Sequence, residues 1–471
     1  MRLLELILVL SCAVCSIRLA GVARGAWIHA VPVVLAVLVV AQVWVEGWRW
    51  QLFPAYTAVI ITACTPLLLQ SAGTQLWSSL ASLALLAISI AACLVLPFVT
   101  PQTADGPFRV GIITLAPNTV QRAKPGIPAS PGSSAPAGVG TGAASGELSA
   151  VPLVHVWYPS EASPQRSLAT WASRRIAAQL RAEATDGTLP GAPIAAHGES
   201  RFPVIVYFDG WPENRIQNTN LIRALASRGF VVASVEYPTL TDRPMVDYAS
   251  EAAFRHSVQA DHDRARAHAK DTVAILDALE SLDRQPASEL AHRLDTQHAG
   301  TLGFSFGGAI AAESSRLDPR IRAVVNMDGR HWGDSLEKGV ERPYLFICEE
   351  LAMPTAADLA SSNPMIRYEA LLDQTDYSRL DANLRALGGV RVTIPGTAHM
   401  NFTDVPLRSP LRRLSQGGTI DPREAQHVVQ TYVIEFFTRY LRSGTPPGLD
   451  SPLPQLPGVR VQSWPAPKAS T

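Results

Sequence analysis

Apolar residues dominate the first hundred positions of this chain in four long stretches. They cover roughly residues 3–20, 27–45, 53–70 and 76–98. Each stretch is about long enough to cross a hydrocarbon core of about 30 Å as a helix, and no charged residue lies between Gln51 and Thr100. Tryptophans stand near their ends, where interfacial aromatic belts occur. The pattern predicts a transmembrane region of about four helices over residues 1–100, rather than the buried helices of a soluble domain.

A few polar residues decide how this region is oriented and which other interpretations remain. Arg18 and Arg24 flank the first loop, which the positive-inside rule assigns to the cytoplasm. Arg2 and Arg49 favour the opposite arrangement, so the prediction only leans toward an extracytoplasmic domain on a multi-pass protein of the cell membrane. A signal peptide ending near Cys12 is disfavoured because three more apolar stretches follow directly. A transporter is disfavoured because the stretches lack buried charged residues.

Short β-rich apolar runs alternate with amphipathic runs from Arg201 onward. Strands are predicted at Phe202–Phe208, Val231–Glu236, His298–Phe304, Ile321–Met327, Tyr344–Cys348 and, as the last strand, Val390–Ile394. Helices are predicted near 221–228, 258–283, 308–316, 364–387 and 421–442. This alternation predicts an α/β fold whose mostly parallel sheet is covered by helices on both faces.

A Pro-, Gly-, Ala- and Ser-rich segment at 116–150 resembles a linker in composition. However, Phe108–Leu115 before it and Val151–Tyr158 after it both have the pattern of strands. We therefore expect the segment to be an insertion at the tip of a hairpin, since loop-closure entropy grows slowly with length. The soluble domain is expected at 106–443, followed by a Pro-rich tail at 444–471.

The pentapeptide Gly303-Phe304-Ser305-Phe306-Gly307 supplies the chemistry of the soluble domain. It is a G-x-S-x-G motif that follows a predicted strand and opens a predicted helix, which is the nucleophile elbow of the α/β-hydrolase fold. A serine hydroxyl needs a base to remove its proton and an acid to orient that base. Ser305 is therefore the predicted nucleophile.

The acid and the base are expected later in the chain, beyond the ends of strands. Asp328 ends the strand at 321–327 and lies 23 residues after the serine, with Asp334 as the alternative acid. His399 follows the last predicted strand in a loop, whereas His427 falls within the terminal helix. The predicted triad is Ser305, Asp328 and His399.

An oxyanion hole needs two backbone N–H groups aimed at the developing negative charge. One is expected from Phe306, the residue after the nucleophile. The other is expected from Trp211, in the loop that follows the strand Phe202–Phe208. Packing of this tryptophan on the sheet edge is an equally good account of its side chain.

Composition narrows the possible functions of the chain. Forty basic and forty acidic residues balance, so nucleic acid is not an expected partner. Cys348 stands alone in the soluble part and is expected to be a small buried residue on a strand. His256, His262 and His268 lie six positions apart and do not stack on one helical face, so we expect solvated side chains and no metal site. No cofactor is predicted.

Several segments together resemble the platelet-activating factor acetylhydrolase family, which comprises the lipoprotein-associated and intracellular type II enzymes. They are Val156–Ser160, Phe208–Trp211, Ala226–Glu236, Gly303–Ala309 and His399–Asp404, together with the spacing from Ser305 to Asp328. The resemblance covers roughly residues 106–443. It implies cleavage of short or oxidised sn-2 acyl groups from phospholipids without calcium. The chain departs from the family in its four apolar stretches, its insertion at 116–150 and its Gly329-Arg330-His331-Trp332 sequence.

These observations predict a membrane-anchored serine carboxylic-ester hydrolase, of the 1-alkyl-2-acetylglycerophosphocholine esterase type. Two alternatives stay open. One is an esterase related to dienelactone hydrolases or cutinases that acts on soluble or polymeric esters through the same mechanism. The other is a membrane sensor or binding module whose hydrolase-like domain does not turn over. The sequence leaves the oligomeric state undetermined.

Overall fold

The computed structural model describes twelve segments of the chain. They are residues 3–20, 30–46, 50–68, 71–95, 104–115, 152–161, 188–198, 200–210, 217–237, 246–408, 416–442 and 453–466. Contacts divide the chain into two compact units. The first comprises 1–100, 166–185 and 406–415, and the second comprises 101–165, 186–405 and 416–471. The predicted insertion at 116–150 lies outside the described residues.

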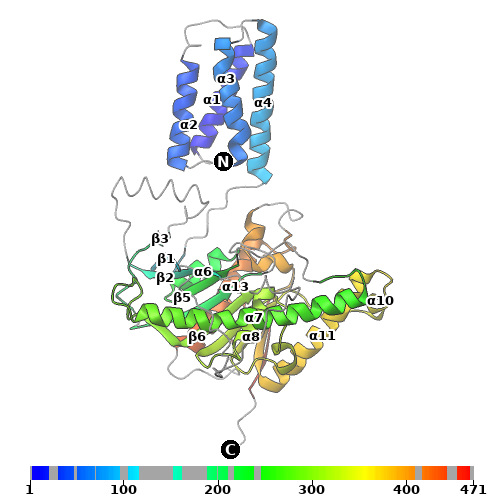
Figure 1. The fold of residues 1–471 in the computed structure, drawn as a ribbon. Helices are drawn as coiled ribbons and strands as arrows, with labels where there is room; N and C mark the ends of the chain where they lie inside the picture. The colour runs from blue at the N-terminus through cyan, green and yellow to red at the C-terminus, as the bar shows by residue number, and fades with distance from the viewer. Residues whose placement is uncertain are drawn as a thin grey trace, which may run out of the picture. The chain divides into compact units, whose positions relative to one another are not determined.

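Four apolar helices form the first unit and pack side by side (Figure 1). They are α1 (Leu3–Ala20), α2 (Val31–Glu46), α3 (Phe53–Leu68) and α4 (Ala72–Val95). Among the described residues, α1 and α4 are long and apolar enough to cross a membrane, and Val31–Trp44 is a shorter apolar helix. The structure thus provides two candidate spans, and a bundle of four spans remains a prediction.

The interior of this bundle combines an apolar cluster with hydroxyl groups, and its outer surface is apolar. Thr62 bonds both Ser16 at 2.8 Å and Ser82 at 3.1 Å, which joins three helices through hydroxyl groups. Large apolar side chains face outward, for example Trp77, which is 73% exposed. Glu5 in α1 is fully buried, so the expectation that the apolar stretches lack a buried charged residue is wrong. Soluble proteins expose few large apolar side chains, because apolar surface is driven out of water.

One ten-stranded sheet organises the described part of the second unit. Its strands are β1 (Arg109–Leu115), β2 (Leu153–Ser160), β3 (Leu189–Pro190), β4 (Phe202–Phe208), β5 (Val231–Glu236), β6 (Leu294–Phe304), β7 (Ile321–Met327), β8 (Tyr344–Cys348), β9 (Gly389–Thr393) and β10 (Arg460–Trp464). Their order is β10-β9-β8-β7-β6-β4-β5-β2-β1-β3. The strands from β5 to β9 in this order are parallel, which confirms the predicted mostly parallel sheet.

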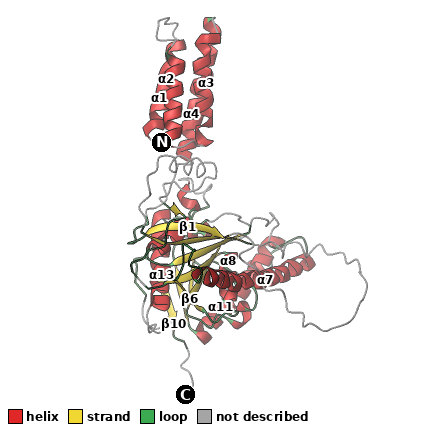
Figure 2. Cartoon of the chain, turned by 60° about the vertical axis from the view of Figure 1, so that its left-hand side comes forward, coloured by secondary structure: helices red, strands yellow, loops and turns green. Residues whose placement is uncertain are grey.

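Helices cover both faces of the sheet, as predicted, and a separate apolar core lies under each layer (Figure 2). The first layer contains α7 (Glu251–Asp283), α8 (Phe306–Ser314) and α11 (Pro364–Leu387). The opposite layer contains α6 (Thr219–Ser227) and α13 (Pro422–Phe437). Side chains at the ends of the loops start two of these helices, since Ser250 accepts the Ala253 N–H and Asp421 accepts the Arg423 N–H. The core clusters fix the sheet between rigid layers.

The hairpin formed by β1 and β2 confirms that the sequence on either side of 116–150 is β-structure. In contrast, the expectation that Val390–Ile394 is the last strand is wrong. Arg460–Trp464, within the predicted tail, forms β10 and pairs antiparallel with β9. The Arg391 guanidinium contributes by bonding Gln462 and lying 5.4 Å from the Trp464 ring. This pairing depends on a distant partner, which the Pro-rich composition around it obscures.

Candidate active site

The candidate site lies at the carboxyl ends of neighbouring parallel strands. β6 is the central strand, with β4 on one side and β7 on the other. From β4 the chain continues outward to β5, whereas from β6 it continues in the opposite direction to β7. Ligands of open α/β sheets bind at such a switch point, outside the carboxyl ends of the strands. Ser305, Asp328 and Gly210 follow β6, β7 and β4 at this edge.

Ser305 occupies a sharp turn between β6 and α8. Its backbone has φ 54° and ψ −125°, a conformation that non-glycine residues rarely adopt, and its N–H donates to the Met327 carbonyl at 2.9 Å. A Cβ on Gly303 would lie 2.0 Å from the Gly307 oxygen, and a Cβ on Gly307 would lie 2.2 Å from the Phe208 oxygen. Both glycines are therefore required by close backbone packing, and the strained turn presents the serine hydroxyl.

The structure brings the three predicted triad residues into one chain of hydrogen bonds. His399 Nε2 lies 2.9 Å from Ser305 Oγ, and His399 Nδ1 lies 2.7 Å from Asp328 Oδ2. With its hydrogen on Nδ1, the imidazole donates to the carboxylate and leaves Nε2 to accept the serine proton. The Phe304 ring packs against the imidazole, with 4.7 Å between the ring centres. This is the arrangement that activates a serine for attack on an acyl carbon.

Asp328 is held by a second contact and adjoins another carboxylate. The Glu349 N–H donates to Asp328 Oδ1 at 3.0 Å from the neighbouring end of β8. Burial, and after it the charge of Asp328, raise the pKa of Glu349 to about 7. Sequence reasoning missed Glu349, although its position directly after a buried strand could have identified it.

The remaining sequence candidates lie elsewhere. Asp334 pairs with Lys338 at 2.6 Å and with Arg266 at 2.9 Å, and these bonds lower its pKa to about 2. His427 is exposed on α13. Asp334 therefore belongs to an ion-pair cluster outside the hydrogen-bond chain.

The expectation of solvated histidines on one helix is confirmed for His256, which is exposed, and is wrong for His268. His268 is only 2% exposed, and His262 accepts a hydrogen bond from the Gly333 N–H at 2.9 Å. The cause is that α7 packs against α8 and β6, so its side chains from Ser257 onward are covered on more than one face. Among the described residues, no three His, Cys, Asp or Glu side chains form a group that could hold a metal ion.

Of the two predicted oxyanion donors, Phe306 is among the described residues and Trp211 is not. Phe306 is the first residue of α8, directly after Ser305. Trp211 lies outside the described residues. Gly210 before it is close to the nucleophile, because a Cβ on Gly210 would lie 3.1 Å from the Cβ of Ser305. The end of β4 thus reaches the reaction site, as an oxyanion loop requires.

A half-buried carboxylate, Asp209, joins the two described ends of this loop. It accepts the Gln217 N–H at 2.6 Å, the Gly210 N–H at 3.2 Å and the Tyr207 hydroxyl at 2.9 Å. Burial raises the pKa of Asp209 to about 7, although these three donors act in the opposite direction. Sequence reasoning treated Asp209 only as part of a family segment, because its partner Gln217 is eight residues away.

The histidine segment is attached to the same loop. The Asp404 N–H donates to the Gln217 carbonyl at 2.8 Å, and the Asp404 carboxylate accepts the Asn220 N–H at 3.1 Å. Asn401 accepts the N–H groups of Ala398 and Gly418, which stabilises the turn that carries His399. Hydrogen bonds therefore connect the segment that carries His399 to the loop that follows β4.

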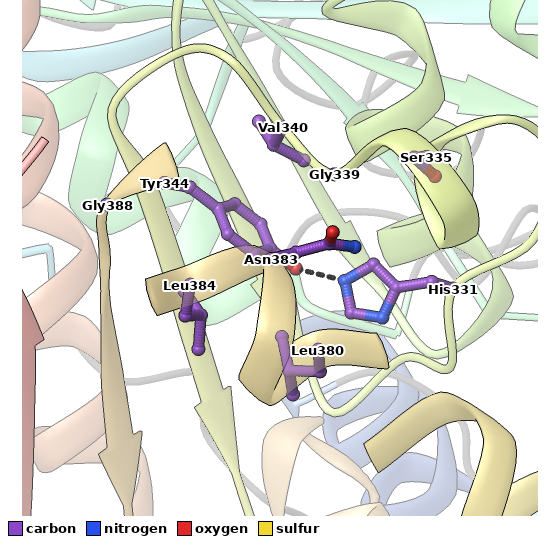
Figure 3. Close-up of a pocket in the computed structure, with 9 residues that line it drawn as sticks. All are labelled: His331, Ser335, Gly339, Val340, Tyr344, Leu380, Asn383, Leu384 and Gly388. Atoms are coloured by element: carbon purple, nitrogen blue, oxygen red, sulfur yellow. Dashed lines mark hydrogen bonds between the residues drawn. The ribbon is translucent and has the colours of Figure 1, made fainter. Parts of the chain in front are cut away.

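The unusual residues after Gly329 have structural partners in α11. The Arg330 guanidinium contacts Glu369 at 2.5 Å and Asp373 at 2.6 Å. His331 lies between the Asp376 carboxylate at 3.0 Å and the Tyr344 hydroxyl at 2.6 Å, and Figure 3 shows the second contact. The cavity drawn there has a volume of about 10 Å³, close to that of one water molecule. It is too small for a substrate, so His331 acts as a structural residue.

A family model and two relatives with similar names match this chain. A family model described as platelet-activating factor acetylhydrolase, isoform II, matches residues 279–444. A probable 1-alkyl-2-acetylglycerophosphocholine esterase of Arthroderma benhamiae is 26% identical over 271 residues, covering 52% of this chain and 63% of that protein. A platelet-activating factor acetylhydrolase of Gallus gallus is 22% identical over 283 residues, covering 51% of this chain and 62% of that protein. The chain thus matches less than two thirds of the length of these relatives.

A solved structure is also similar. The ferulic acid esterase of Streptomyces cinnamoneus has 25% sequence identity and a TM-score of 0.48, and the match covers 77% of this chain and 97% of that chain.

The sheet, the helical layers and the serine turn define the second unit as an α/β hydrolase. The matched relatives are named as an esterase and an acetylhydrolase of acetylated glycerophosphocholine or platelet-activating factor. The chain is similar to the platelet-activating factor acetylhydrolase-like family, in agreement with the resemblance predicted from its residues.

Proposed function

We propose that the chain is a serine esterase in which Ser305, His399 and Asp328 form the catalytic triad. The hydrogen-bond chain from the serine through the imidazole to the carboxylate is the observation that carries this proposal. His399 takes the Ser305 proton while Oγ attacks the ester carbonyl, and it then passes that proton to the departing alkoxide. Asp328 orients the imidazole and stabilises its charged form.

The acyl-enzyme is then hydrolysed by the same groups. His399 removes a proton from water, the resulting hydroxide attacks the acyl carbon, and Ser305 Oγ leaves with the proton that His399 returns. The backbone N–H groups of Phe306 and Trp211 are the proposed oxyanion donors in both steps. Asp209 supports the second donor by bonding Gly210 and Gln217 on either side of it.

The proposed substrate is a phospholipid with a short or oxidised acyl group at the sn-2 position. Support comes from the family match and from relatives whose names specify acetylated glycerophosphocholine or platelet-activating factor as the substrate. Esterases acting on soluble or polymeric esters share the mechanism, so a substrate series is needed to decide. The proposed reaction uses side chains, backbone amides and water.

A membrane location is proposed for the first unit. Two of its helices are long and apolar enough to span a bilayer. Its apolar surface and hydroxyl-bonded interior also suit lipid as the surrounding medium, because interhelical Ser and Thr hydrogen bonds are common in membrane bundles. A bundle of four spans would keep the hydrolase near lipid, with a lean toward the extracytoplasmic side.

A fluorophosphonate probe tests the catalytic proposal directly, because it reacts only with an activated serine. The detergent-solubilised full chain should be labelled and should hydrolyse p-nitrophenyl acetate, whereas Ser305→Ala should do neither. His399→Ala should lose both signals while keeping the melting temperature of the parent. A chain that is folded but neither labelled nor active would instead support the non-hydrolytic binding module.

A further inference from the structure

A cavity of about 170 Å³ lies between α7, α11 and the segment that follows the catalytic acid. Phe254, Val258 and His262 contribute one wall, and their spacing of four residues places them on one face of α7. Leu371, Leu372 and Thr375 of α11 form the opposite wall. The cavity is thus bounded by two helices, α7 and α11, which follow the parallel strands β5 and β8.

The polar groups around this cavity make their hydrogen bonds within the protein. Arg330 is held by Glu369 and Asp373, and His331 bonds Asp376 and Tyr344. The Thr375 hydroxyl donates to the Leu371 carbonyl in its own helix at 2.8 Å.

The one remaining histidine of the wall is also engaged. His262 accepts the Gly333 N–H, and burial lowers its pKa, which favours the neutral ring. Its ring packs edge-on against Trp332. The wall therefore presents mainly apolar surface, and an apolar group that covers this surface removes it from water.

The cavity is close to the reaction site along the chain. Arg330 contributes to its wall and is two residues after Asp328, so the two Cα atoms are at most about 7 Å apart. Asp328 in turn bonds His399, which bonds Ser305. The segment that lines the cavity therefore begins two residues after the carboxylate that bonds His399.

We propose that this cavity binds an aliphatic chain of the ester substrate and selects substrates by that chain. The inference rests on the proposed esterase function and specifies its substrate. At about 170 Å³ the cavity is smaller than the pockets that enclose whole drug-sized ligands, so it receives part of one chain and not an entire lipid. The chain is either the acyl group or the alkyl group at the sn-1 position.

Thr375→Phe tests the proposal by filling the cavity from α11. Thr431→Phe in α13 is the matched control, because Thr431 also donates its hydroxyl to the carbonyl four residues earlier, at 2.8 Å, on the opposite face of the sheet. One arm uses p-nitrophenyl esters from acetate to decanoate. The other uses 2-acetyl phosphocholines with short and long 1-alkyl chains. Val258→Phe fills the cavity from α7, so the proposal can still be tested if Thr375→Phe does not fold.

The expected result is a loss of about tenfold in kcat/KM on long chains relative to short ones in both filled variants, comparable to a poor fit of one or two methylenes. Activity on p-nitrophenyl acetate and fluorophosphonate labelling should be unchanged. The arm that responds identifies the acyl or the alkyl chain. An unchanged long-to-short ratio in both arms and both variants would overturn the proposal.

Binding of cis-parinaric acid, a fluorescent fatty acid, measures the affinity of the cavity for an aliphatic chain without requiring ester hydrolysis. The full chain should bind it saturably, and Thr375→Phe should weaken that binding by about tenfold while Thr431→Phe does not. If the parent shows this binding but no ester hydrolysis, the proposed function fails and the cavity assignment stands. If Thr375→Phe binds the probe like the parent, the cavity assignment fails regardless of the enzymatic result.

Discussion

Asp209 is a half-buried carboxylate that bonds residues on either side of the proposed oxyanion loop. Its oxygens accept two backbone N–H groups that lie on either side of the oxyanion loop and one tyrosine hydroxyl. An amide in its place keeps only one acceptor oxygen and turns donor hydrogens toward the other N–H group. The carboxylate is therefore a positioning residue for the proposed oxyanion donors.

Asp209→Asn should lower kcat by roughly tenfold to hundredfold with a smaller change in KM, because loss of one oxyanion donor costs about a hundredfold or more. Steady-state kinetics on p-nitrophenyl acetate measure both parameters. Asp421→Asn is a suitable control, since Asp421 also accepts two backbone N–H groups but caps α13. Equal kcat values for parent and Asp209→Asn would show that the loop is held by other contacts.

Glu349→Gln should weaken the loss of stability between pH 4.5 and about 7. Because folding raises the pKa of Glu349 from its ordinary value of 4.5 to about 7, ionisation of this group costs stability as the pH rises through that range. The variant lacks the ionisable group, so its stability should fall less over the same range. Thermal melts of both proteins at several pH values measure the difference. An equal or steeper fall in the variant would contradict this account.

Among elements, the turn between β6 and α8 packs closely against backbone on both sides. Gly303 lies against the start of α8 and Gly307 lies against the end of β4, and no Cβ fits at either position. The strain at Ser305 is held by this packing and by the N–H donated to Met327. The element therefore fixes the nucleophile beside Gly210.

Gly307→Ala should destabilise the chain by about 1–3 kcal/mol and abolish fluorophosphonate labelling, because the new methyl group overpacks against the Phe208 carbonyl. Gly73→Ala is the control, since nothing lies within 4 Å of a Cβ at that helical position. Thermal unfolding and probe labelling measure the two effects. Normal labelling of Gly307→Ala would mean that the turn tolerates a wider separation from β4.

Elements with local signals were predicted from the sequence, and elements with distant partners were not. The motif around Ser305 and the order of residues along the strands led to Asp328 and His399, which the structure brings within hydrogen-bond distance. β10 was missed because an edge strand is defined by its neighbour β9. Asp209 was missed as a loop support because its partner Gln217 lies eight residues further along the chain.

The histidines of α7 and the buried Glu5 are further features that depend on residues distant in the sequence. Spacing alone predicted that the helix surface is solvated, but tertiary packing covers His268. Similarly, the sparse charges of the first hundred residues gave no indication that Glu5 is fully buried. Burial of a single side chain depends on which helices surround it, and composition does not contain that information.

At the scale of the whole molecule, the chain combines a bundle with an apolar exterior and an α/β hydrolase. Large exposed apolar side chains are concentrated in the bundle, and few occur on the described surface of the hydrolase unit. Contiguous exposed apolar surface is rare on soluble proteins and indicates contact with protein or membrane. This contrast is the physical basis for the proposed membrane anchor.

The full chain should stay with membranes after an alkaline carbonate wash and should be released by detergent. A membrane-impermeant fluorophosphonate should label Ser305 in intact cells if the hydrolase lies outside, as the arginines around the first loop favour. Labelling only after permeabilisation would place the hydrolase in the cytoplasm. Release by carbonate alone would contradict membrane insertion and leave the apolar bundle as a protein interaction surface.

The most direct test of the central claim is acetate release from a 1-alkyl-2-acetyl glycerophosphocholine by the detergent-solubilised chain in the presence of a calcium chelator. The account predicts steady turnover by the parent and none by Ser305→Ala, although both proteins melt at similar temperatures. Hydrolysis of p-nitrophenyl acetate without acetate release from the lipid would keep the triad and reject the phospholipid substrate. Equal acetate release by parent and Ser305→Ala would contradict the account at its centre.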